Sequence, residues 1–154
     1  MWEGSTSADQ LAALGRLDVR FADEGLEYGV FERWAVDLHG GVVTRAHDDV
    51  DVAVWAADAD RVARALELDG WTTVPQEVGD GYRVYARDGV RLEVAFLAHG
   101  GDGGVHTPLA DGGRAPWPQG AFGDGVAVLG RRGKDRADSA TLNRLITNRL
   151  GPSR

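Results

Sequence analysis

The segment from Asp49 to Trp55 places acidic and apolar side chains in the two-residue period of a β-strand. Its three valines would lie on one face, and Asp49 and Asp51 would lie on the other. Aspartate is disfavoured in strands because its short side chain favours turns, so a strand of this composition is unusual. The pattern predicts a sheet with one face against an apolar core and a second face that carries charge.

Amphipathic helices are predicted before and after this strand. Ser7 to Leu17 carries leucines at helical spacing behind a Ser/Asp start. A second apolar stripe follows Asp58, which can cap a helix that ends at Gly70. We expect a short helix from Arg33 to His39 and a final helix that starts at residue 135 or 139 and ends at residue 150.

Further strands are predicted from Leu26 to Phe31 and from Trp71 to Val74. The strongest hairpin signal is Asp88-Gly89, a two-residue turn between a strand over residues 82–87 and a strand over residues 90–97. In this last strand Glu93 would point away from the apolar face.

Residues 98–125 contain nine glycines and three prolines, a composition that predicts no regular element. A loop of this length in a compact domain is usually functional or mobile. Trp117 and Phe122 provide apolar anchors within it, and Asp102, Asp111 and Asp124 provide negative charge. We expect this loop to close over a ligand.

Composition limits the function classes. The 154 residues predict one domain over residues 1–154, and the formal net charge of −7 would repel a phosphate backbone, so we expect no nucleic-acid partner. The chain has no cysteine, which excludes disulfides, thiolate metal sites and cysteine nucleophiles. No apolar run approaches the roughly 20 residues that span a bilayer. We expect a cytoplasmic protein without a membrane partner.

Two aspartates at positions i and i+2 of a strand have α-carbons about 6.5–7 Å apart on one face. Their carboxylates can converge on Mg²⁺, which prefers oxygen ligands and keeps positions open for phosphate groups. Glu93, on a predicted neighbouring strand, could add a third carboxylate. The alternative is that Asp48, Asp49 and Asp51 are only the solvated face of an amphipathic strand.

The stretch Trp34-Ala-Val-Asp-Leu-His-Gly-Gly-Val-Val-Thr-Arg-Ala-His-Asp-Asp-Val-Asp-Val-Ala-Val54 combines these features in one order. It resembles the signature of the lincosamide and aminoglycoside 2″-type nucleotidyltransferases of the DNA polymerase β-like superfamily. There a helix, a Thr-Arg-x-His turn and an Asp-x-Asp strand follow one another. The resemblance continues through about Leu97 and, less strongly, through the run from Asp111 to Pro118 and the run from Lys134 to Asp138.

The resemblance implies an α+β fold in which helices flank a small mixed sheet. It also implies an enzyme that transfers a nucleoside monophosphate from Mg²⁺-NTP, with ATP as the expected donor, to a hydroxyl of an aminoglycoside, lincosamide or similar small molecule. A cationic antibiotic fits the acidic chain best, and a homodimer is compatible with the family.

Site residues are carried over from the same resemblance. Asp49 and Asp51 match the metal-binding aspartates, and Glu93 matches the third carboxylate, which can serve as a metal ligand or as a general base. Arg45 and His47 match the Arg-x-His of the motif. Arg45 would contact the triphosphate, and His47 would orient the aspartates or the phosphate.

Two alternatives to this activity stay open. Relatives carry Gly-Gly where this chain has Glu32-Arg33, and a glutamate would bring negative charge toward the triphosphate. The chain could therefore be a catalytically degenerate homologue that binds a nucleotide or a small molecule. The other alternative is a nucleotidyltransferase with a macromolecular acceptor, for which a protein fits the negative charge better than tRNA.

Overall fold

The computed structural model describes residues 6–31, 49–75, 81–99, 105–109, 111–116 and 126–129. Within these residues, α1 (Ser7–Asp23) precedes β1 (Tyr28–Phe31), and β2 (Val50–Trp55) leads through the 3₁₀ turn η1 (Ala56–Asp58) into α3 (Ala59–Leu68). The later elements are β3 (Thr72–Thr73), β4 (Tyr82–Arg87), β5 (Val90–His99), β6 (Val105–Pro108), β7 (Arg114–Pro116) and β8 (Val126–Leu129). The expected helices after Arg33 and after residue 135 lie outside the described residues.

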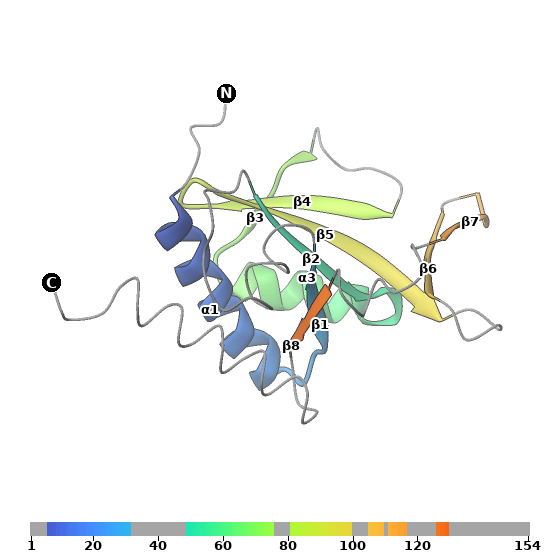
Figure 1. Ribbon diagram of the computed structural model, residues 1–154, viewed down its shortest axis with the longest axis horizontal. Coiled ribbons are helices and arrows are strands. Elements are labelled where there is room, and N and C mark those ends of the chain that lie inside the picture. The colour runs from blue at the N-terminus through green and yellow to red at the C-terminus, as the bar shows by residue number, and fades with distance from the viewer. Residues whose placement is uncertain are drawn as a thin grey trace, which may run out of the picture.

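The strands form one mixed sheet in the order β3-β4-β5-β2-β1-β8, and β6 and β7 extend from β5 (Figure 1). In the described part of the chain, β2 and β5 pair in parallel and the other pairs are antiparallel. The link from β2 to β5 runs through α3, β3 and β4. This connection brings two strands that are distant in sequence next to each other at the centre of the sheet.

Helix α1 begins with a capping box. Thr6 Oγ1 accepts a hydrogen bond from the backbone N–H of Asp9, and the Asp9 side chain accepts one from the backbone N–H of Thr6. The helix runs to Asp23, six residues beyond the predicted end at Leu17. Phe21 explains the extension because it continues the leucine stripe by one more turn and is fully buried.

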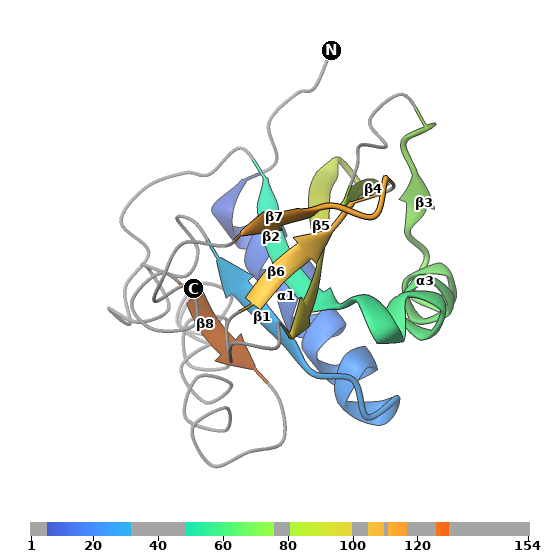
Figure 2. The same ribbon diagram turned by 90° about the vertical axis from the view of Figure 1, so that its right-hand side faces the viewer.

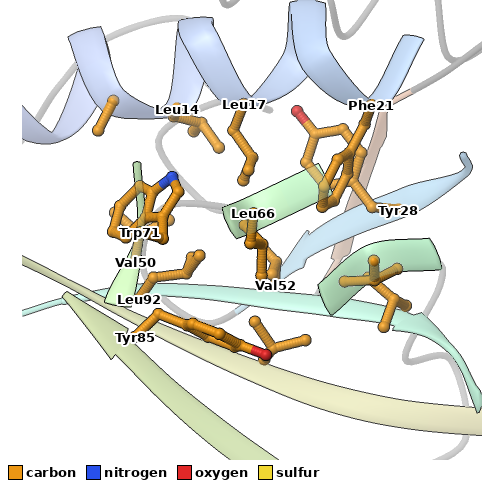
Figure 3. Packing of buried hydrophobic residues seen from close by; sticks show 14 of the residues in the cluster. Leu14, Leu17, Phe21, Tyr28, Val50, Val52, Leu66, Trp71, Tyr85 and Leu92 are labelled. Atoms are coloured by element: carbon orange, nitrogen blue, oxygen red, sulfur yellow. The ribbon is translucent and has the colours of Figure 1, made fainter. Parts of the chain in front are cut away.

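Helices α1 and α3 lie on the same face of the sheet, and the apolar core lies between them and the strands (Figure 3). Leu14 and Leu17 of α1, and Leu66 of α3, face Val50, Val52 and Leu92 of the central strands. Each of these six side chains is at most 2% exposed. Full burial of one such side chain stabilises the fold by roughly 1.5–3 kcal/mol, so this packing fixes which face of β2 and β5 stays outside.

Asp58 occupies the N-cap position of α3 as predicted, but its side chain makes no capping hydrogen bond at the helix start. The carboxylate instead contacts Arg61 Nη1 at 3.4 Å. The second nitrogen, Nη2, donates to the backbone carbonyl of Glu24 just after α1. Arg61 thus links the start of α3 to the end of α1.

None of the described helices is long and apolar enough to cross a membrane.

The predicted hairpin is confirmed: β4 and β5 are joined by Asp88 and Gly89, with φ of 51° and 81°. Two successive residues with positive φ give the turn whose twist matches the strands.

The absence of regular structure expected over residues 98–125 was wrong in part. Strand β6 pairs with the end of β5, and β7 pairs with β6 (Figure 2). Pro108 and Pro116 are the last residues of these short strands, where a missing N–H is tolerated. Trp117 and Phe122 lie outside the described residues.

Candidate functional site

Asp49, Asp51 and Glu93 come together on the face of the sheet opposite α1 and α3. Asp51 pairs with Glu93 in the parallel register of β2 and β5. The residues that flank them, Val50 and Val52 around Asp51 and Leu92 and Val94 around Glu93, are buried in the core. The alternation of each strand therefore directs both carboxylates to the other face. The predicted convergence of the three carboxylates is confirmed. Asp51 and Glu93 lie on the adjacent strands β2 and β5, and Asp49 directly precedes β2.

The three carboxylates are close enough to share a cation. Each offers an oxygen atom, and the three oxygens lie within 4.8 Å of one another. Around an octahedral Mg²⁺ with metal–oxygen distances of about 2.1 Å, neighbouring ligands are about 3.0 Å apart and opposite ligands about 4.2 Å apart. Rotation of the three side chains would bring their oxygens onto one ion. The donor set, all carboxylate oxygen and half-buried, suits a hard divalent cation.

The surroundings of Asp51 disfavour its ionised form. Partial burial, the charge of Asp49 and the close contact with Glu93 raise the pKa of Asp51 from its ordinary value of 3.8 to about 8. Without a cation, one proton is therefore held among the three carboxylates at neutral pH. A metal ion would replace that proton, because a ligating carboxylate must be ionised.

Arg91 is the functional candidate that sequence reasoning missed. It lies on β5 two residues before Glu93, and its Nε lies 3.7 Å from Asp49 Oδ2. The two side chains are 20% and 26% exposed. The signal in the sequence was the period of the strand, which places residues 91 and 93 on one face. Arg91 thus brings a positive charge to the edge of the carboxylate group.

Arg45 and His47 lie outside the described residues, as do Glu32 and Arg33. Asp49 is the first described residue after this segment, so the Arg-x-His sequence ends two residues before the carboxylate group.

Comparison with known proteins gives a consistent result. A family model described as aminoglycoside-2″-adenylyltransferase matches residues 15–132. The fold is similar to that of the lincosamide antibiotic adenylyltransferase LnuA, solved with lincomycin bound, with a TM-score of 0.60 and 18% identity. It is also similar to ANT(2″)-Ia in complex with adenylyl-2″-tobramycin, with a TM-score of 0.57 and 14% identity.

Both alignments cover 93% of this chain and 99% of the other. They confirm the expected fold class, α+β with a small mixed sheet of the polymerase β-like nucleotidyltransferase type. A search of curated protein sequences found no match.

Proposed function

The chain belongs to the aminoglycoside-2″-adenylyltransferase family, and we propose that it transfers a nucleoside monophosphate from Mg²⁺-NTP to a hydroxyl of an antibiotic. ATP is the expected donor, and an aminoglycoside or a lincosamide is the expected acceptor. The names of the two similar structures support an antibiotic acceptor, because one was solved with lincomycin and the other with an adenylylated tobramycin.

The observation that carries this proposal is the group formed by Asp49, Asp51 and Glu93, whose oxygens lie within 4.8 Å of one another. Asp49 and Asp51 would hold Mg²⁺, and the ion would supply charge neutralisation at the phosphates of the donor. Glu93 would accept the proton of the acceptor hydroxyl. Three carboxylates that repel one another have a physical reason to bind a cation.

In the proposed reaction the acceptor oxygen forms a bond with the α-phosphorus, and the bond from that phosphorus to the bridging oxygen breaks. Pyrophosphate leaves with the electron pair, and the hydroxyl proton goes to Glu93. Arg45 is proposed to contact the triphosphate, and His47 to orient the aspartates or the phosphate. Cytoplasmic location and a homodimer are further parts of the proposal.

The test is release of pyrophosphate from Mg²⁺-ATP with pooled aminoglycosides and lincosamides. We expect release by the wild type, and a loss of at least about a hundredfold in Asp51→Asn and in Glu93→Gln, the range for general acid–base groups and metal-assisted chemistry. Asp88→Asn is the matched control. Asp88 is an 82% exposed aspartate at the turn of the same hairpin, and asparagine also accepts its positive φ. Equal activity in Asp51→Asn would refute the assignment.

The second candidate is a binding module that has lost turnover. Glu32-Arg33 in place of Gly-Gly favours it, because a small anion-binding turn needs bare backbone N–H groups. This candidate predicts that ATP or an antibiotic binds without pyrophosphate release. Release with a protein substrate in place of an antibiotic would instead identify a macromolecular acceptor.

A further inference from the structure

Arg91 contacts the carboxylate group from one side, through Asp49. The distance of 3.7 Å between Nε and Oδ2 is an ion-pair distance, and it is too long for a hydrogen bond that would fix the carboxylate in one orientation. The interaction is therefore mainly that of two opposite charges. Asp49 has a second oxygen, so pairing with Arg91 still leaves it able to bind a cation.

We propose that Arg91 is a positioning residue that acts through Asp49 as a counter-charge and weakens the binding of free divalent cation. The cation is then held firmly only together with a triphosphate. This inference rests on the proposed function, because it requires that Asp49 binds the metal.

The charges give the direction of the effect. Once a cation has replaced the shared proton, the three ionised carboxylates carry −3, and Arg91 reduces the sum for these four described residues to −2. A divalent cation at the carboxylates is repelled by the guanidinium, and at separations of a few ångströms such an interaction amounts to roughly 1 kcal/mol or more even in water. A triphosphate changes the balance, because its negative charge is attracted to both the cation and Arg91.

A role of Arg91 through its charge and a purely geometric role predict opposite changes in metal affinity when Arg91 is replaced. If Arg91 held Asp49 in a fixed orientation, its removal would weaken the metal site, as loss of an outer partner usually does. If Arg91 acts by charge, its removal strengthens binding of the metal alone. The variant Arg91→Lys distinguishes the charge role from the geometric role further, since lysine keeps the charge and loses the planar, forked donor geometry.

The experiment titrates Mn²⁺, a paramagnetic substitute for Mg²⁺, into the protein at pH 8 and measures free ion by its electron paramagnetic resonance signal. We expect Arg91→Gln to bind Mn²⁺ about tenfold more tightly than the wild type, the size that removal of one nearby charge predicts. Arg91→Lys should stay within about threefold of the wild type because the charge is kept. With a non-hydrolysable ATP analogue present, the advantage of Arg91→Gln should disappear.

Arg83→Gln is the matched control. It removes one positive charge from β4, where Arg83 lies over the Phe96 ring at 5.5 Å, and it should leave Mn²⁺ binding unchanged. Arg91→Thr is a second neutral variant for the case that Arg91→Gln does not fold, since a β-branched residue suits a strand.

Weaker or unchanged Mn²⁺ binding in the neutral Arg91 variants would overturn the inference. Mn²⁺ binding by Asp51→Asn distinguishes a wrong role for Arg91 from a wrong proposed function. If the wild type binds Mn²⁺ and Asp51→Asn does not, the metal site stands and only the role of Arg91 is lost. If Asp51→Asn binds Mn²⁺ as well as the wild type does, the metal site itself is wrong.

Discussion

Asp51 shows how one residue connects the fold to the chemistry. The valines on either side of it hold β2 against the core, and this forces its carboxylate next to those of Asp49 and Glu93. The position is unfavourable for a charge, which is why its pKa is raised to about 8. A site that destabilises the ionised metal-free state has a strong tendency to take up either a proton or a cation.

The raised pKa predicts how stability depends on pH. The folded protein binds the Asp51 proton more tightly than the unfolded chain does, so the proton stabilises the fold. This stability is fully present below about pH 4, and it is lost as the pH rises from the ordinary value of 3.8 to about 8.

Urea unfolding in EDTA should therefore show a free energy of unfolding that falls over this range, by up to about 1.4 kcal/mol per pH unit for one proton. Asp51→Asn should lack this component, and Mg²⁺ should restore stability at pH 8. A wild-type profile identical to that of Asp51→Asn would rule out the buried proton.

At the scale of elements, β6 pairs with the end of β5 and also packs against the residue that precedes β4. Gly81, directly before β4, has a φ of 90°, and Thr107 of β6 packs closely over it. Thr107 is 8% exposed. A side chain at position 81 would occupy the space of the threonine methyl group, so glycine is required both by the backbone conformation and by the close approach of the strand.

A pair of alanine variants separates these two requirements. Gly89 has a similar φ of 81°, but an added Cβ there meets nothing within 4 Å. Gly89→Ala should cost about 1–2 kcal/mol, from the positive φ alone. Gly81→Ala should cost roughly 1–3 kcal/mol more, because the new methyl group overlaps Thr107 Cγ2. Urea unfolding measures the free energy of unfolding of both variants. Equal decreases would show that Thr107 of β6 does not restrict the space at position 81.

Sequence patterns predicted the elements whose signals are local. The Asp88-Gly89 turn, the valine alternation of β2 and the leucine stripe of α1 each depend on neighbouring residues, and each is found in the structure. The end of α1 was missed because Phe21 extends the stripe beyond the last leucine. Strands β6 and β7 were missed because the glycines and prolines around them mask short strands, which form by pairing of β6 with β5 and of β7 with β6.

At the scale of the whole molecule, the site depends on a pairing that no local pattern specifies. Asp51 and Glu93 meet because β2 and β5 are parallel neighbours, although a helix and two strands separate them in sequence. Alternation predicted the face of each residue, but it did not predict the parallel register that places Asp51 beside Glu93. The ion pair of Arg91 with Asp49 depends on the same register, and for that reason it emerged only from the structure.

The charge of the whole chain predicts which acceptors bind best. With a formal net charge of −7 and an acidic site, the protein should attract polycationic aminoglycosides more strongly than lincosamides, which carry less positive charge. Exposed charge contacts are screened over a Debye length of about 10 Å at 0.1 M salt, so aminoglycoside affinity should fall as salt rises. Calorimetric titration of both drug classes at two ionic strengths tests this. Aminoglycoside binding that ignores salt would show that shape and hydrogen bonds, rather than net charge, select the acceptor.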